Sequence, residues 1–171
     1  TGTNQDGKTN GTTAPSVNSQ IDLLRDTYRR YGIDASTINY VETHGTGTKL
    51  GDPIELEALS TVFTEHSGRK NFCALGAVKT NLGHTSGAAG VAGVHKVLLS
   101  LRNGTIAPNV NLRHENALFD FAASPFYISR AAHDWTPAAA NHTTASSRSG
   151  RQPPGAAGHG RRPCPWGGRG G

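Results

Sequence analysis

Cysteine and long apolar runs are scarce in this sequence, and methionine is absent. Two cysteines, Cys73 and Cys164, cannot form the disulfide framework of a small secreted domain, and neither has a zinc-ligand spacing with a histidine. No stretch is apolar over the ~18 residues that a membrane span needs, and residues 1–7 are too polar for a signal peptide. We therefore expect a reduced, cytoplasmic setting without membrane contact. The lack of an initial methionine predicts a piece cut from a longer chain.

Acidic residues are missing from residues 138–171. Residues 1–137 carry 12 Lys and Arg against all 12 Asp and Glu, so the formal net charge of +5 comes from five arginines in the tail. Glycine, proline and serine crowd this tail without apolar periodicity, so it cannot bury enough surface to offset chain entropy. We expect one partial domain over residues 1–137 and a disordered, low-complexity tail over residues 138–171.

The most informative stretch, residues 40–55, predicts a strand, a loop and a helix. An apolar run ends at His44, and a histidine at the end of a buried strand can project from a rigid element into a cleft. The neighbouring glycines let the backbone approach a ligand, while the hydroxyls of Thr46 and Thr48 both donate and accept hydrogen bonds. Asp52, followed by a proline, is expected to cap the next helix.

A second unit of the same kind follows. Residues 72–78 form a nearly continuous apolar run, which predicts a central strand covered on both faces. The predicted loop 79–87 contains His84, and the helix expected over residues 88–102 is apolar enough to be a core helix. Because equivalent ends of parallel strands open on one side of a sheet, we expect an α/β layer with His44 and His84 in one cleft.

Periodicity predicts two further helices. Residues 16–32 give an amphipathic surface helix that is capped by Ser16 or Asn18 and ended by Gly32. Its apolar positions are Ile21, Leu24, Tyr28 and Tyr31. The helix over residues 53–65 buries a wide apolar face and leaves three acids outside: Glu55, Glu57 and Glu65. Residues 126–128 predict an edge strand, and Trp135 closes the pattern.

Three runs carry a family resemblance. They are Asn4-Gln5-Asp6-Gly7, Glu42-Thr43-His44-Gly45-Thr46-Gly47-Thr48 with Gly51-Asp52-Pro53-Ile54-Glu55, and Lys79-Thr80-Asn81-Leu82-Gly83-His84. Together they resemble the β-ketoacyl synthase domains of modular polyketide synthases, within the thiolase superfamily. The resemblance covers residues 1 to about 137 and implies the C-terminal portion of a thiolase-like layered α-β-α-β-α fold.

The resemblance implies an acyltransferase that performs decarboxylative Claisen condensation. A cysteine accepts the acyl chain, and a malonyl-type extender on acyl carrier protein loses CO₂ before its carbanion attacks. His44, His84 and Lys79 match the catalytic positions of the family, with neutral imidazoles donating to the enolate oxygen. Thr46, Thr48 and Asn81 match positions that bind the phosphopantetheine arm, the only cofactor group implied. The family also implies a homodimer in the full-length enzyme.

The sequence departs from the family pattern at three places. The nucleophilic cysteine lies in an Ala-Cys-Ser run that is absent here, so we expect the fragment to be inactive alone. Gly93 stands where many fatty-acid condensing enzymes carry glutamate, which favours the polyketide reading. The glycine-rich Phe-Gly-Gly-Thr-Asn-Ala-His strand expected after Trp135 is replaced by the tail, which we attribute to a reading-frame slip. Resequencing that gave the same tail in an unbroken frame would reject that hypothesis.

Three alternatives stay open beside this reading. Residues 45–51 suggest a phosphate loop, yet they meet neither the P-loop pattern nor the dinucleotide fingerprint. The basic tail suggests a nucleic-acid segment, yet it lacks repeated aromatic and arginine units, so we expect no nucleic-acid partner. A non-elongating ketosynthase-like domain that binds acyl carriers is the third alternative.

Overall fold

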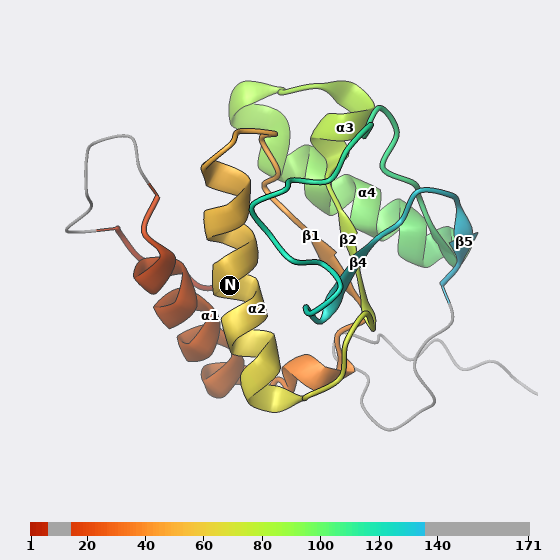
Figure 1. The fold of residues 1–171 in the computed structure, drawn as a ribbon. Coiled ribbons are helices and arrows are strands. Elements are labelled where there is room, and N and C mark those ends of the chain that lie inside the picture. Colours follow the sequence, from red (N-terminus) through yellow and green to blue (C-terminus); the bar gives the residue numbers. More distant parts are fainter. Residues whose placement is uncertain (7–14, 136–171) are drawn as a thin grey trace, which may run out of the picture.

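Helices cover both faces of a small parallel sheet in the computed structural model, which describes residues 1–6 and 15–135 (Figure 1). The elements in chain order are α1 (Val17–Tyr31), η1 (Ala35–Thr37), β1 (Tyr40–Glu42), α2 (Gly51–His66), β2 (Cys73–Gly76), α3 (Val78–Leu82), η2 (Ser86–Ala88), α4 (Ala89–Asn103), β3 (Thr105–Ile106), β4 (Phe126–Ile128) and β5 (His133–Asp134). The disorder predicted for residues 138–171 lies outside the described residues.

The sheet has the order β1-β2-β4, and both pairings are parallel. All four residues of β2 are buried, which confirms the prediction of a central strand covered on both faces. Cys73 and Leu75 face the cluster that α2 contributes to, whereas Ala74 faces the opposite cluster with Tyr40. The predicted edge strand is β4, and β3 pairs separately with β5 in an antiparallel ribbon.

Helices α1 and α2 pack together on one face of the sheet (Figure 1). Phe63 of α2 is fully buried and contacts the fully buried Phe126 of β4, with ring centroids 5.0 Å apart. The predicted ends of α1 are confirmed, because the Ser16 hydroxyl accepts from the Ser19 N–H at 3.2 Å and Gly32 adopts a left-handed conformation. Tyr31, which periodicity placed on the apolar face, is 54% exposed.

Helix α4 lies on the other face, and the prediction that it is a core helix is wrong for the described structure. Only Ala89, Gly93 and Ser100 are buried on it. Four apolar side chains form an exposed row, which we call the α4 stripe: Val91, Val94, Leu98 and Leu101. Residues 1–6 and 15–135 supply one layer against α4, and no second layer among them covers the stripe.

Residues 79–87, predicted as a loop, contain two short helical turns. The five-residue helix α3 begins two residues after β2 and ends at Gly83, where φ is +81°. Strand β1 is shorter than predicted, because it ends at Glu42. Trp135 closes the described fold: its ring lies 5.1 Å from that of Tyr40, and its Nε1–H donates to Asn39 at 2.9 Å.

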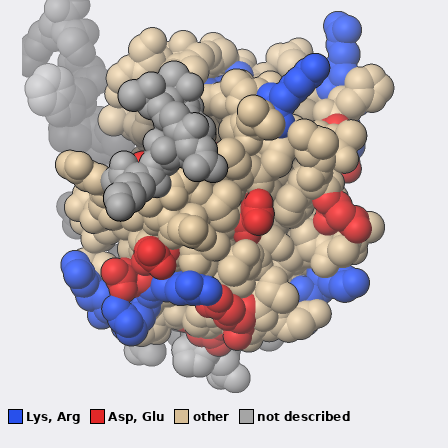
Figure 2. Space-filling view, turned by 60° about the vertical axis from the view of Figure 1, so that its left-hand side comes forward, with Lys and Arg blue, Asp and Glu red and all other residues tan. Residues whose placement is uncertain are grey.

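The face formed by α1 and α2 carries charges of both signs side by side (Figure 2). Two ion pairs contribute there, Arg25 with Glu65 and Arg29 with Asp26. Acidic and basic side chains are therefore paired with each other on this face. Within residues 1–6 and 15–135, no helix combines the length and the apolar character that crossing a membrane requires.

Candidate active site

The loop after β1 turns sharply over the end of β2. Thr43 extends the strand pairing, because its backbone N–H and its hydroxyl both donate to the Gly76 carbonyl, at 2.8 and 2.9 Å. Gly45 follows with φ +47°, and a side chain there would meet the Ala77 Cβ at 2.8 Å. The positive φ and the close side chains of Ala77 and Thr43 both favour glycine at this position. The loop therefore places His44 directly above the junction between β2 and α3.

Acids of α2 hold this loop from the other side. The Glu55 carboxylate accepts from the backbone N–H groups of His44, at 2.6 Å, and Gly45, at 3.0 Å. Asp52 accepts from the Gly47 N–H at 3.1 Å. Two predictions are corrected here. Glu55 does not point to solvent, and Asp52 is not the helix cap, because α2 begins at Gly51 and Asp52 lies in its first turn.

Lys79 reaches His44 from the first turn of α3. Its ammonium donates to the His44 carbonyl oxygen and lies 3.4 Å from the Nδ1 atom of the same side chain. The two residues are 35 positions apart in sequence, and the parallel pairing of β1 with β2 brings them together. The Lys79 ammonium and the His44 imidazole, which were predicted to follow the equivalent ends of two strands, therefore lie in contact.

His84 comes from the turn after α3. Its ring lies 6.1 Å from that of His44, at an interplanar angle of 87°. The two rings are close neighbours, as the prediction of one cleft requires, although His84 is not among the residues that line the hollow beside His44. Their origins differ from the prediction, because His84 does not leave a strand end: α3 and Gly83 stand between it and β2. The short helix turns the chain back so that its C-terminal end faces the β1 loop.

Hydrogen bonding assigns the same tautomer to both imidazoles. The Ser86 backbone N–H donates to His84 Nδ1 at 2.9 Å, and the Lys79 ammonium faces His44 Nδ1. A ring nitrogen that accepts carries no proton, so the proton of each neutral ring resides on Nε2. Both residues are exposed. The arrangement can therefore present two donors to one developing negative charge.

The three residues predicted to bind a pantetheine arm lie in two places. Thr46 and Thr48 are exposed on the loop beside His44, with hydroxyl oxygens 3.4 Å apart, and Thr48 also accepts from the Gly51 N–H. Asn81 lies on α3, where its amide donates to the Pro108 carbonyl at 3.2 Å. It lines a different hollow from the one beside His44 and Lys79.

A cavity of about 410 Å³ opens between this cluster and α4. Its lining includes His44 and Lys79 on one side and Val94 and Leu98 of the α4 stripe on the other. Glu42 also lines it, and the sequence reading missed that residue. The available signal was a carboxylate two positions before His44 in an otherwise apolar strand.

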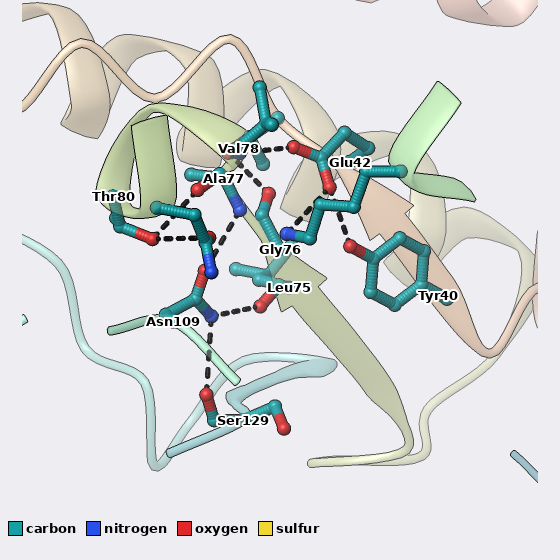
Figure 3. Close-up of polar contacts among 12 residues, drawn as sticks. Tyr40, Glu42, Leu75, Gly76, Ala77, Val78, Thr80, Asn109 and Ser129 are labelled. Carbon is teal, nitrogen blue, oxygen red and sulfur yellow. Dashed lines mark hydrogen bonds and ion pairs between the residues drawn. The ribbon is translucent and has the colours of Figure 1, made fainter. Parts of the chain in front are cut away.

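Glu42 belongs to a buried polar group shown in Figure 3. Its carboxylate accepts from the Tyr40 hydroxyl at 2.5 Å and forms an ion pair with Lys96 at 3.0 Å. Burial, followed by the hydrogen bond to Glu42, raises the pKa of Tyr40 above its ordinary value. Tyr40 therefore stays a neutral donor over the physiological pH range.

No accessible cysteine stands beside the two histidines in residues 1–6 and 15–135. Cys73 is fully buried in β2, and burial raises the pKa of its thiol to about 12. A thiol in that state is neither accessible nor ionised at neutral pH. Cys164 lies outside the described residues. The described part of the chain also contains no cluster of three His, Cys, Asp or Glu side chains that could hold a metal ion.

Known proteins match this chain over the same region. Polyketide synthase PksL of Bacillus subtilis is 60% identical over 134 residues, which make up 78% of this chain and 3% of PksL. A component of the phenolphthiocerol/phthiocerol polyketide synthase of Mycobacterium tuberculosis is 46% identical over 132 residues, or 77% of this chain and 8% of that protein. The chain thus spans a small part of these relatives.

Solved structures share the fold. The ketosynthase from module 6 of the bacillaene synthase of Bacillus subtilis has 59% identity and a TM-score of 0.77, over 79% of this chain and 24% of that chain. The oxazolomycin ketosynthase domain OzmH KS7 of Streptomyces albus has 34% identity and a TM-score of 0.76, over 80% and 24%. The model of the β-ketoacyl synthase C-terminal domain matches residues 1–113. The chain therefore belongs to the β-ketoacyl synthase family, as part of a thiolase-like ketosynthase domain of the polyketide synthase type.

Proposed function

We propose that the complete protein containing this chain is an acyltransferase of the β-ketoacyl synthase type, and that this chain supplies the two imidazoles and the ammonium group of its active site. The main observation in support is that the rings of His44 and His84 lie 6.1 Å apart, each with its Nδ1 atom facing a donor. Two Nε2–H groups can then donate to one oxygen as negative charge develops on it.

The proposed reaction is decarboxylative Claisen condensation. The bond between the malonyl carbon and its carboxylate breaks, CO₂ leaves, and the electron pair passes into the enolate of the remaining thioester. His44 and His84 donate to that enolate oxygen. The carbanion carbon then attacks the acyl thioester held on a cysteine, the new C–C bond forms, and the cysteine thiolate leaves. That cysteine has to come from outside the described residues, because Cys73 is buried.

Lys79 has a supporting role in this proposal. Its ammonium contacts both the carbonyl oxygen and the Nδ1 atom of His44, so it fixes the ring orientation and the tautomer. The positive charge also adds electrostatic support where anionic character develops. A lysine that acts in this way touches the histidine rather than carrying the acyl chain.

We further propose that acyl carrier protein delivers the extender on its phosphopantetheine arm. Thr46 and Thr48 are exposed beside His44 and can hydrogen-bond amides of such an arm. Asn81 is proposed to act at the same arm from α3, on the side of Pro108. A homodimer of the complete protein and a cytoplasmic location stay predictions that accompany this assignment.

A hybrid ketosynthase tests the proposal. In it, residues 1–135 of this chain replace the matching segment of the bacillaene module 6 ketosynthase, which is 59% identical. We expect the hybrid to condense an acyl thioester with malonyl-acyl carrier protein, and H44A or H84A to slow the reaction by roughly 10²–10³-fold. The product is measured by mass spectrometry of the carrier protein.

H66A is the matched control, because His66 is an exposed histidine at the end of α2 that contacts Asp34 rather than the site. Its condensation rate should equal that of the unmodified hybrid. A folded hybrid that does not condense contradicts the proposal, and so does an H44A or H84A variant of full activity. Acyl loading without elongation would instead favour a non-elongating domain.

A further inference from the structure

The Glu42 carboxylate is buried where β1, α3 and α4 meet (Figure 3). Its side chain is 10% exposed, two hydrogen-bond donors reach its two oxygens, and the Lys96 ammonium lies 3.0 Å from Oε2 as an ion-pair partner. Oε2 faces the Tyr40 hydroxyl and the Lys96 ammonium, whereas Oε1 accepts from the backbone N–H of Val78. A buried carboxylate with its oxygens shared among fixed donors has little freedom to move.

The position of these partners along the chain connects two parts of the candidate site. Glu42 precedes His44 by two residues on the segment that leaves β1, and Val78 immediately precedes Lys79. One carboxylate therefore ties the segment that carries the imidazole to the helix that carries the ammonium. Lys79, whose ammonium contacts His44, lies in the first turn of α3, next to the residue that donates to Glu42.

Helix α3 depends on acceptors from outside itself. It has five residues, and its N-cap residue Ala77 provides no side-chain cap. The free N–H groups at a helix start need acceptors, and two buried side chains supply them. Val78 donates to Glu42, and Ala77 donates to Asn109 at 2.9 Å on the opposite side of the junction (Figure 3).

Two glycines leave the space that Glu42 occupies. A Cβ atom on Gly93 of α4 would stand 3.3 Å from the Glu42 Cγ. A Cβ atom on Gly76 of β2 would stand 1.8 Å from the Tyr40 hydroxyl oxygen and 2.8 Å from the Glu42 Oε2. The absence of side chains at these two glycines thus leaves room for the carboxylate and its partners. An ion pair at the protein surface would not need such space.

We propose that Glu42 is a positioning residue that sets the place of Lys79 relative to His44 by holding the Val78 N–H to the end of β1. The inference rests on the proposed function, because this placement affects a rate only if the two residues take part in condensation. Lys96 neutralises the buried carboxylate, and Tyr40 fixes its orientation. The hydrogen bond from the Val78 N–H to Glu42 is the contact that holds the start of α3 in place.

Two double variants of the hybrid ketosynthase separate the hydrogen bond from the charge. E42Q/K96M removes both charges and keeps an oxygen that can accept from Val78, whereas E42L/K96M removes both charges and the acceptor. A buried ion pair can be replaced by apolar groups with little loss of stability, so both variants are expected to fold. Thermal unfolding verifies that their folded fractions match. R25M/E65M, which removes the exposed ion pair between α1 and α2, is the control.

We expect E42L/K96M to slow condensation by roughly 100-fold while E42Q/K96M stays within about threefold of the unmodified hybrid, since small misplacements of reacting groups have effects of this size. The loss should appear in kcat rather than in KM for the carrier protein. Hydrogen exchange gives an independent measure: the Val78 amide should be protected in the unmodified hybrid and in E42Q/K96M, and should exchange faster in E42L/K96M.

Equal rates and equal Val78 exchange in both variants would overturn the proposal, and so would a rate loss shared by E42Q/K96M while Val78 stays protected, because the charge would then be what matters. If the unmodified hybrid folds without condensing, the proposed function fails. Hydrogen exchange at Val78 still tests the hydrogen bond from Val78 to Glu42 in that case. A difference in exchange between the two double variants supports the positioning role of Glu42, and equal exchange rejects it.

Discussion

Glu55 of α2 accepts hydrogen bonds from the backbone N–H groups of His44 and Gly45, one with each carboxylate oxygen, at 2.6 and 3.0 Å. A single side chain thus fixes two consecutive residues of the loop that carries the first imidazole. The bond runs from the first turns of a long helix, which is a rigid support. The loop needs such support because Gly45 and Gly47 both adopt positive φ angles, and glycine backbones rotate freely without a side chain to restrict them.

Replacing Glu55 by alanine leaves both N–H groups without an acceptor. We expect E55A to lower the free energy of unfolding of the hybrid ketosynthase by about 1–3 kcal/mol, and E55Q, which keeps an acceptor, to lower it by less. Chemical denaturation measures the difference. Glu57 on the same helix is exposed, so E57A should leave stability nearly unchanged. An E55A variant as stable as E57A would contradict the assigned role.

The ion pair between Arg25 and Glu65 predicts a pH dependence. The hydrogen bond from Arg25 lowers the pKa of the Glu65 carboxyl below its usual value. A lowered pKa in the folded state stabilises the fold above the unfolded pKa, and this contribution is lost as the pH falls through the folded pKa. We expect E65Q to reduce the urea midpoint of the hybrid slightly at neutral pH, and this reduction to disappear in acid once the Glu65 carboxyl of the folded state is protonated.

Both partners of this pair are about half exposed, at 49% and 41%, so the effect should be small and should shrink in high salt. E57Q, measured over the same pH range, controls for the loss of an exposed helical carboxylate without such a partner. A difference between E65Q and the unmodified hybrid that grew as the pH fell would contradict the sign of this prediction.

Elements could be predicted from the sequence where their stabilising contacts lie within their own segments. Local signals predicted α1 and β2 correctly, because the cap at Ser16, the left-handed Gly32 and the apolar run of β2 act within their own segments. Helix α3 was missed for the opposite reason: its first N–H groups are held by Glu42 and Asn109, which are distant in sequence. The residues of α3 and its immediate neighbours therefore do not indicate that these acceptors are present.

The two histidines were paired correctly by topology rather than by local pattern. Parallel strands end on the same side, so a strand-end argument was enough to bring His44 near the chain that follows β2. The exposure of α4 could not be predicted, since periodicity indicates that a face is apolar and not which segment covers it. Glu55 was assigned to solvent because helical position alone does not locate a neighbouring loop.

Cys73 should be inert in the folded chain. Its side chain is fully buried, and burial raises the pKa of the thiol to about 12, so the reactive thiolate is scarce at pH 8. In a C164S background we expect iodoacetamide to leave Cys73 unmodified under native conditions. Mass spectrometry follows the reaction, and 6 M urea is the positive control. Native modification as fast as that in urea would contradict the burial of this thiol.

The α4 stripe predicts that the chain by itself binds apolar dyes. Val94 and Leu98 lie at its centre and are 61% and 57% exposed. We expect V94Q/L98Q to lower the fluorescence of bound anilinonaphthalene sulfonate and to reduce self-association in sedimentation velocity, because contiguous exposed apolar surface drives both. Y31Q/L118Q removes two comparably exposed apolar side chains that lie outside the α4 stripe and should change neither signal. Equal effects of the two variants would contradict a continuous apolar face.

The tautomer of His84 can be observed directly. Its Nδ1 accepts from the Ser86 N–H at 2.9 Å, so the neutral ring should carry its proton on Nε2. Long-range ¹H–¹⁵N correlation spectra of the hybrid distinguish the two forms of the neutral ring. Ser86 has φ +50°, a conformation that glycine adopts readily, so S86G should keep the N–H donor and the Nε2–H tautomer. A ring protonated on Nδ1 would remove the acceptor from this contact, and the second donor toward the enolate oxygen would be lost with it.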